Sequence, residues 1–278
     1  MKQLIVNADD LGRSPGVNRG ILDAHHQGIV TSTTVMINYP DAPAGIEAVL
    51  KDAPALGLGL HFNLTTFKPV SLPAAIPSLV NADGWFYPIS QWTTQPFQAD
   101  DFRREMTAQL DRFVSLAGRL PDHFDAHHHS VYLHPLALPI LLDLADQHHL
   151  PMRDSGFDRS PSDMLGILPA SEVETLATEL RAIVAARPIA PIFPARLSMD
   201  FFGSHATLGD LLVILTTLPA DSVTEIMCHP GYLDDALRTS DYSTHREEEI
   251  KHLTHQATRE CVASEQINLT NFGRLMRP

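Results

Sequence analysis

Two adjacent aspartates, Asp9 and Asp10, follow a short apolar run near the start of the chain. The run at residues 4–6 is rich in β-formers and residues 11–16 are rich in turn formers, which predicts a buried first strand ending at the aspartates. Neighbouring side chains of a strand point in opposite directions. One aspartate can therefore ligate a metal while the other accepts a proton. The simpler interpretation is a turn aspartate that caps the next helix, beside a solvated neighbour.

A histidine-rich segment at residues 125–129 (DAHHH) supplies a second group of candidates. If this segment is extended, Asp125, His127 and His129 share one face. Imidazole and carboxylate groups on one face are typical ligands of Zn²⁺ and similar ions. The alternative is a polar loop, or histidines that are satisfied by hydrogen bonds at the end of a strand.

The clearest periodicity lies at residues 56–64 (LGLGLHFNL), where apolar residues alternate with two glycines, His61 and Asn63. Period two predicts a strand whose apolar face packs under helices and whose other face points into a barrel interior. We expect the glycines to leave space beside His61 for a ligand or a substrate. Asp10, His61 and one histidine of 127–129 would then form a metal site with open coordination positions. A lone inward histidine is, however, usually structural.

His229 and Arg153 are further candidates. His229 follows a predicted strand at residues 222–228 and is either a turn histidine or an acid or base on the far side of the metal. We expect nearby carboxylates to keep the pKa of His229 near the working pH. Arg153 can orient a carboxylate or bind an anionic group, although an ordinary ion pair is the simpler interpretation.

The composition excludes several classes of function. The chain has 278 residues, 20 of them Lys or Arg and 33 Asp or Glu, and its formal charge of −13 argues against nucleic acid or an anionic membrane as the main partner. The two cysteines form no disulfide framework, which indicates a reducing compartment. We find no room for a signal peptide and no apolar stretch of membrane-spanning length, so we expect a cytoplasmic protein.

Strand-like and helix-like segments alternate along the chain, which predicts an α/β fold. Besides the first strand, we expect strands at 29–37, 56–64 and 222–228, a strand end at 121–129 and a short strand at 152–153, and helices at 17–27, 41–52, 99–117, 136–147, 171–186 and 244–263. A single domain over residues 1–278 would form a (β/α) barrel or distorted barrel of mostly parallel strands, with the site at the strand C-terminal ends. Residues 65–97 are rich in proline and aromatic residues and are expected to form an insertion or lid loop.

Five segments in chain order resemble the YdjC-like carbohydrate deacetylases, which include the chitooligosaccharide (diacetylchitobiose) deacetylases. They are residues 7–12, 28–34, 59–65, 125–129 and 229–232. The resemblance implies a (β/α) barrel-like fold, a divalent metal, removal of an N-acetyl group and a homodimer. It matches Asp10, His61 and His127 to the metal ligands and Asp9 to the catalytic base. The chain departs from many family members at Val131, where they carry a further histidine, and this departure bears on substrate choice.

We therefore predict a metal-dependent hydrolase that removes the N-acetyl group from an acetylated amino sugar or chitooligosaccharide, with Asp9 as base and His229 as acid. The expected cofactor is one divalent ion, Mg²⁺ or Zn²⁺. The expected partner is a small N-acetylated sugar. Further candidates for contacts with the substrate or the ligands are His129, Arg153, Asn63 and Tyr232. Candidate sugar-stacking aromatics are Trp85, Trp92 and Tyr232.

Three other functions fit some of the same residues. Two histidines and one carboxylate are also the iron ligands of non-haem Fe(II) oxygenases, although such an enzyme needs no adjacent aspartate as base. A two-metal phosphatase or nuclease needs more bridging carboxylates than the sequence offers. A non-catalytic sugar-binding protein would keep its binding without Asp9. The sequence leaves the acetylated acceptor and the identity of the metal open.

Overall fold

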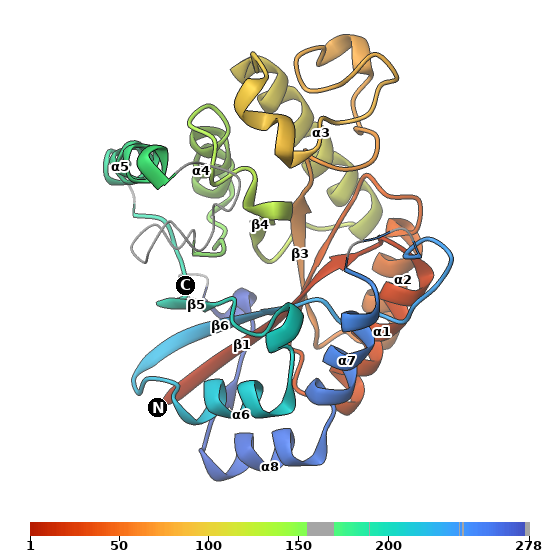
Figure 1. Ribbon diagram of the computed structural model, residues 1–278, viewed down its shortest axis with the longest axis vertical. Coiled ribbons are helices and arrows are strands. Elements are labelled where there is room, and N and C mark those ends of the chain that lie inside the picture. Colours follow the sequence, from red (N-terminus) through yellow and green to blue (C-terminus); the bar gives the residue numbers. More distant parts are fainter. Residues whose placement is uncertain (155–169, 189, 239, 241, 276–278) are drawn as a thin grey trace.

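The computed structural model describes residues 1–154, 170–188, 190–238, 240 and 242–275. Its centre is a parallel sheet in the order β4-β3-β2-β1-β6-β5, with β7 also paired to β1 (Figure 1). The strands are β1 (Lys2–Leu11), β2 (Ser32–Val35), β3 (Gly57–Phe62), β4 (Phe124–Ala126), β5 (Arg196–Ser198), β6 (Ser222–Cys228) and β7 (Asn268–Leu269). Among the described residues the order of strands ends at β4 and β5, so the sheet is a distorted half-barrel and the predicted α/β fold is confirmed.

Helices surround this sheet (Figure 1). They are α1 (Pro15–Gln27), α2 (Ala42–Asp52), α3 (Ala99–Ala117), α4 (Leu138–His148), α5 (Ala170–Ala185), α6 (Leu208–Thr216), α7 (Thr244–Leu253) and α8 (Gln256–Ser264). The central strand β1 is apolar and fully buried from Leu4 to Val6, because sheet neighbours and helices cover both of its faces. No described helix is long and apolar enough to cross a bilayer.

Several predicted elements differ from the structure. The short strand expected at 152–153 is an isolated bridge between Met152 and Phe124. The strand expected at 29–37 is shorter and spans only β2. The single helix expected at 244–263 is two helices, because the chain leaves helical geometry at Thr254 and His255 and the His255 side chain caps α8 by accepting a hydrogen bond from the Ala257 N–H. β5, β7 and α6 carried no sequence prediction. The Ser171 side chain, half of the expected capping box, lies outside the described residues.

The end of β1 has an irregular backbone that separates the two aspartates. The pairing register with β2 shifts between Ala8 and Leu11, and Asp10 has a φ of 75°, in the left-handed region. Such a conformation is uncommon for a residue other than glycine and occurs often at functional sites. Gly12 follows with a φ of 89°, and a Cβ there would lie 2.6 Å from the Cα of Ala42. The turn after Asp10 therefore requires glycine.

The predicted free space beside His61 is wrong. A Cβ on Gly59 would lie 2.4 Å from the ring of His123, and one on Gly57 would lie 2.9 Å from Ser32 Oγ. The glycines of β3 thus admit neighbouring side chains rather than a substrate. His123 fills the space and its ring stacks on Phe272 at 3.8 Å between centroids.

The predicted alternation along residues 125–129 ends one residue into the histidine run. β4 stops at Ala126 and the chain enters a 3-10 turn, in which His128 and His129 have φ values of 54° and 51°. His127 is buried and His128 is exposed. The three imidazoles therefore do not alternate as a strand would place them: His127 lies 3.2 Å from Asp10, and the ring of His128 stacks on that of His127 at 3.9 Å between centroids.

Candidate active site

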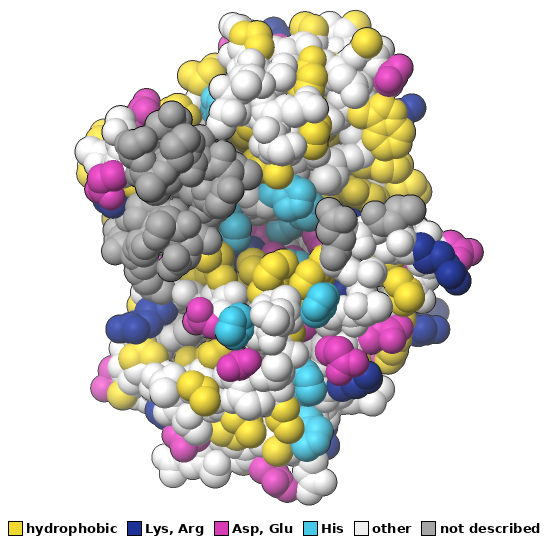
Figure 2. All heavy atoms as spheres, in the orientation of Figure 1, with side chains coloured by type: hydrophobic (Ala, Val, Ile, Leu, Met, Phe, Trp, Pro, Cys, Tyr) yellow, Lys and Arg dark blue, Asp and Glu magenta, His cyan; other side chains and the backbone are white. Residues whose placement is uncertain are grey.

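A pocket of about 520 Å³ lies at the carboxyl ends of the parallel strands. Figure 2 shows it as a hollow in the centre of one face, with histidine and acidic side chains inside it. Its lining residues are Asp9, Asp10, Arg13, His61, Thr66, Ala126, His127, His128, His129, Met199, Phe202, Met227, His229, Ser240, Tyr242 and Arg246. The position agrees with the prediction that the site occupies the ends of the strands.

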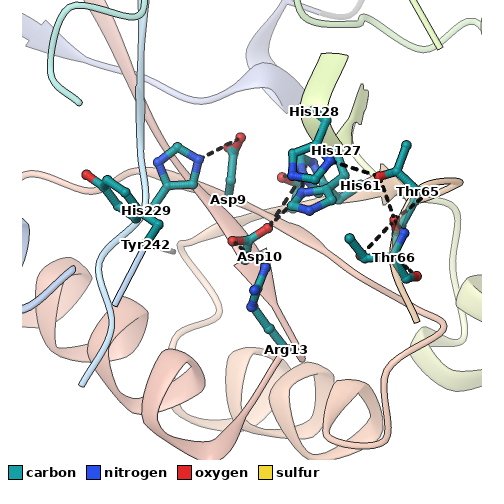
Figure 3. Close-up of polar contacts among 12 residues, drawn as sticks. Asp9, Asp10, Arg13, His61, Thr65, Thr66, His127, His128, His229 and Tyr242 are labelled. Atoms are coloured by element: carbon teal, nitrogen blue, oxygen red, sulfur yellow. Dashed lines mark hydrogen bonds and ion pairs between the residues drawn. The ribbon is translucent and has the colours of Figure 1, made fainter. Parts of the chain in front are cut away.

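Asp10, His61 and His127 converge on one point in this pocket (Figure 3). His61 Nε2 lies 3.7 Å and His127 Nδ1 lies 3.2 Å from Asp10 Oδ1, and the two nitrogens are 3.3 Å apart. Asp10 Oδ1 is buried and has no hydrogen-bond donor among the described residues. A buried carboxylate oxygen that faces two imidazole nitrogens fits a divalent metal ion. These three residues can hold such an ion, in the combination that the sequence predicted.

Asp125 sets the orientation of His61. Its Oδ1 lies 2.6 Å from His61 Nδ1, while Thr34 Oγ1 donates to its Oδ2 at 2.9 Å. The contact places the Nδ1 proton toward Asp125 and leaves Nε2 facing the ligand group. Burial lowers the pKa of His61, but the carboxylates of Asp125, Asp9 and Asp10 outweigh it and the net shift is upward. The same negative charges that favour a proton here favour a cation.

The other oxygen of Asp10, Oδ2, faces two arginines. Arg246 donates from Nη2 to Asp10 Oδ2, and Arg13 Nη1 lies 3.8 Å from the same oxygen. Although burial alone would raise the pKa of Asp10, Arg246 and His127 hold it well below its usual range. Asp10 is thus ionised, with one oxygen toward the cations of the protein and one toward the imidazoles. Burial lowers the pKa of His127 to about 4, which leaves its ring neutral and able to ligate.

Asp9 has different neighbours. Arg153 binds it with two hydrogen bonds, Nη1 to Oδ2 at 2.8 Å and Nη2 to Oδ1 at 2.7 Å, and Asn7 Nδ2 donates to Oδ1 at 2.8 Å. Burial opposes ionisation, but Arg153 outweighs it and the pKa of Asp9 is lowered. Arg153 is completely buried, so its predicted role of orienting a carboxylate agrees with its placement and a direct contact with an anionic substrate does not.

Arg153 also binds Glu225, which sequence reasoning did not single out. The guanidinium Nε donates to Glu225 Oε1 at 2.8 Å, and Nη2 lies 3.1 Å from Asp125 Oδ2. Burial, with Asp9 and Asp125 adding to it, raises the pKa of Glu225 to about 8, against the opposing effect of Arg153. The sequence feature that could have identified Glu225 is its charge in the middle of the predicted strand at residues 222–228.

His229 faces Asp9 from the end of β6, with Nε2 3.9 Å from Asp9 Oδ2 (Figure 3). Its backbone N–H donates to Glu249, whose Oε1 also lies 4.0 Å from the ring Nδ1. The expectation of a pKa near the working pH is wrong for this structure. Burial lowers the pKa of His229 to about 4 and outweighs the carboxylates of Asp9 and Asp10.

The remaining candidates divide between the pocket and the scaffold. His129 lines the pocket, and burial lowers its pKa to about 3. Asn63 is outside the lining and holds the following loop, because its Oδ1 accepts from the backbone of residues 65 and 66. Tyr232 is also outside the lining, since its hydroxyl donates to Asp23 at 2.8 Å. Val131 is fully buried in the core. The expected roles of Asn63 and Tyr232 at the substrate are not supported.

The two tryptophans expected to stack on sugar also lie elsewhere. Trp92 is buried against Phe97 at 5.1 Å, and Trp85 meets Phe67 at 5.3 Å between centroids. Of residues 65–97, Thr66 lines the pocket. Sequence reasoning missed Arg246, Glu249, Tyr242, Arg13 and Phe202. The first three lie on or beside α7, whose polar sequence is typical of a surface helix.

The chain belongs to the YdjC-like protein family, whose model matches residues 3–264. A carbohydrate deacetylase of Brevibacillus brevis is 35% identical over 276 residues, covering 98% of this chain and 99% of the relative. A chitooligosaccharide deacetylase of Salmonella paratyphi C is 34% identical over 266 residues, or 94% of each chain. The crystal structure of an Enterococcus faecalis V583 protein described as a cellobiose-phosphate cleavage protein has a TM-score of 0.84 at 30% identity and 99% coverage of both chains.

A more distant likeness concerns the fold alone. The Xyl-CE4 domain of a multidomain xylanase from the hindgut metagenome of Trinervitermes trinervoides superposes with a TM-score of 0.51 at 10% identity. The superposition covers 99% of this chain and 89% of that domain. The distorted half-barrel is therefore shared well beyond recognisable sequence identity.

Proposed function

We propose that this protein is a metal-dependent deacetylase that hydrolyses the N-acetyl group of an acetylated amino sugar or chitooligosaccharide. The observation that carries the proposal is the separation of two adjacent carboxylates. Asp10 Oδ1 faces His61 and His127, whereas Asp9 is held ionised by Arg153 and faces His229. Relatives named carbohydrate deacetylase and chitooligosaccharide deacetylase support the substrate class.

Asp10, His61 and His127 would hold one divalent cation, which when bound polarises the acetyl carbonyl and acidifies a water. A second group of donor atoms, from Asp9, His61 and Asp125, also comes close together. The guanidinium of Arg153 binds the carboxylates of Asp9 and Asp125. The charge of Arg153 therefore already balances these two carboxylates, and no second cation is needed there. We therefore propose one metal ion per chain, with Zn²⁺ favoured by the imidazoles and Mg²⁺ by the carboxylate.

The side chains around this centre move one proton. Asp9 is ionised and accepts a proton from the attacking water, while Arg153 and Asn7 fix its orientation. His229 lies beside Asp9 and donates a proton to the departing amine, which would otherwise leave as an unstable amide anion. Because His229 is neutral at neutral pH in the free protein, we propose that it receives this proton from Asp9 during the reaction.

Cleavage of a glycosidic bond is the second candidate, because of the name given to the Enterococcus faecalis structure. A glycosidase needs one carboxylic acid that keeps its proton and protonates the leaving oxygen. The carboxyl groups that line the pocket are those of Asp9 and Asp10, and arginine neighbours lower the pKa of both, so neither carries a proton at neutral pH. This electrostatic arrangement favours acyl transfer over glycoside hydrolysis.

The single domain over 1–278 also remains our proposal, with residues 65–97 as an insertion. Trp92 and Phe97 of this segment join the same hydrophobic core as β1 and β3. Thr66 is its contribution to the pocket wall. Both observations support an insertion that packs as part of the domain.

The test is acetate release from a panel of N-acetylated mono- and oligosaccharides, measured with metal, with chelator and after metal is restored. His127→Ala should lose both the metal, measured by elemental analysis, and activity. His26→Ala, a change at an exposed histidine of α1, should keep both. A metal-loaded protein that releases no acetate from any of these sugars, or one that releases monosaccharide instead, would refute the proposal.

A further inference from the structure

The pocket has an aromatic wall that none of the proposed catalytic roles uses. Phe202 lines the pocket and is 44% exposed, although a phenyl ring gains free energy from burial. Its ring is parallel to that of Tyr242, with centroids 4.4 Å apart and an angle of 7° between the planes. Tyr242 therefore covers one face of Phe202, and a large apolar surface remains open. An exposed aromatic in a pocket indicates a binding surface.

This wall is held in place by polar contacts. The backbone N–H of Gly203 donates to the Tyr242 hydroxyl at 3.2 Å, so the residue after Phe202 is tied to the ring behind it. The same hydroxyl donates to Glu249, a buried carboxyl group that also accepts a hydrogen bond from the His229 backbone N–H. On its other side Tyr242 stacks on His245 at 5.2 Å between centroids. The aromatic wall is thus built into the frame that holds His229.

The position of the wall identifies which part of a substrate it meets. The ring of Phe202 lies 5.4 Å from the ring of His229 between centroids, and Tyr242 lies at 5.5 Å. An acid that protonates the leaving nitrogen must come within about 3 Å of it. In an N-acetylated amino sugar that nitrogen is bonded directly to the sugar ring. The ring that carries the reacting group must therefore lie next to His229, against the aromatic wall.

We propose that Phe202, backed by Tyr242, is the stacking platform for the pyranose ring that carries the acetamido group. The substrate is then a cyclic N-acetylhexosamine unit, and an open-chain acetamide is a poor substrate. This inference rests on the proposed deacetylase function. The wall is uncharged where Phe202 and Met199 form it, which suits the C–H face of a neutral sugar ring.

The test compares N-acetylglucosamine with N-acetylglucosaminitol, its reduced open-chain form, which keeps the acetamide and loses the ring. Phe202→Leu keeps an apolar side chain without an aromatic face and should lower kcat/KM for the cyclic sugar roughly 10-fold. The same variant should change kcat/KM for the open-chain form less than twofold. Phe202→Trp should retain the preference for the ring. Trp85→Leu removes an equally exposed aromatic outside the pocket, 41% exposed, and should change neither value.

Binding measured by calorimetry on the metal-loaded protein separates the two possible failures. A wild-type protein that binds N-acetylglucosamine about 10-fold more tightly than Phe202→Leu does, yet releases no acetate from any sugar, would support the platform and refute the deacetylase. Equal losses on the cyclic and open-chain compounds, or no loss on either, would refute the platform. Metal content and Tm of Phe202→Leu should match the wild type, because the side chain is exposed and ligates nothing.

Discussion

Replacing Arg153 by methionine removes the cation shared by Asp9, Asp125 and Glu225. The guanidinium is completely buried and donates to Asp9 at 2.7 and 2.8 Å and to Glu225 at 2.8 Å. Methionine matches the aliphatic stem of arginine and carries no guanidinium, so the change leaves three buried carboxyl groups without their partner. The ligands Asp10 and His127 make no hydrogen bond to Arg153. Asp125, which orients the third ligand His61, keeps its contacts with His61 and Thr34, so we expect the metal site to survive.

The expected magnitude follows from the burial of the cluster. Breaking a buried ion pair by removing one partner costs about 3–5 kcal/mol. For a chain of 278 residues the entropy of unfolding converts this into a Tm lower by about 5–9 °C. Without Arg153 the pKa of Asp9 should rise, because the guanidinium is the main group that opposes the effect of burial. A larger fraction of Asp9 would then carry a proton and its orientation would be lost, so activity should fall, by up to the ~10²–10⁴-fold that a general base contributes.

The assay combines thermal unfolding, metal content and acetate release, with Arg187→Met as the matched control. Arg187 also binds two carboxylates, Asp143 and Asp146, but it is 20% exposed at the surface. Such pairs contribute about 0–1 kcal/mol, so the control should unfold within about 2 °C of the wild type. A Tm change in Arg153→Met no larger than in the control, or full activity at neutral pH, would refute the reasoning about this cluster.

Three further predictions concern the same centre. Asp10→Asn should weaken metal binding measured by calorimetry, whereas Asp9→Asn should keep the metal and lose about 10²–10⁴-fold in turnover; equal loss of metal in both variants would contradict the division of roles. His229→Ala should slow hydrolysis of an N-acetyl sugar more than that of its O-acetyl counterpart, because an alkoxide leaves more easily than an amide anion; equal losses would mean that His229 does not protonate the leaving group. Glu225 has a pKa raised to about 8, so the stability it contributes is complete below its unfolded value and is lost as the pH rises through 8. Glu225→Gln carries no charge, so its Tm relative to wild type should increase between pH 5 and 8, and a constant difference across that range would contradict the shift.

The sequence predicted the parts of this protein that depend on local pattern. The period-two pattern of residues 56–64 predicted the strand observed as β3, and the apolar run before Asp9 predicted the strand observed as β1. α3 spans the predicted helix without any shift at either end. Asp10, His61 and His127 were all placed at strand ends, and parallel strands bring their carboxyl ends to one edge of a sheet. β3 and β4 are neighbours and β2 alone separates β3 from β1, so the strand order brings the three residues to the same edge, while the left-handed φ of Asp10 and the 3-10 turn after β4 set their final directions.

The local sequence pattern led to wrong predictions where a side chain from a distant element fills a space. The glycine face of β3 was taken as an open surface, because its sequence does not show that His123 packs against Gly59. Tryptophans at 85 and 92 were favoured as sugar platforms by residue type, yet Trp92 is buried in the core. The platform proposed here uses Phe202, which precedes the 3-10 turn Gly203–His205 and belongs to no periodic segment.

The roles of the two aspartates also depend on distant residues. Their adjacency on β1 predicts that the side chains point apart, but not which one ligates and which one accepts a proton. That choice is made by two arginines: Arg153 lies 144 residues from Asp9 and Arg246 lies 236 residues from Asp10. Arg153 engages both oxygens of Asp9, whereas Arg246 engages one oxygen of Asp10 and leaves the other free. A carboxylate with a free buried oxygen is suited to a metal, and one held on both oxygens keeps its orientation and charge for proton transfer. The division of labour is therefore a property of the folded charge network rather than of the Asp-Asp pair.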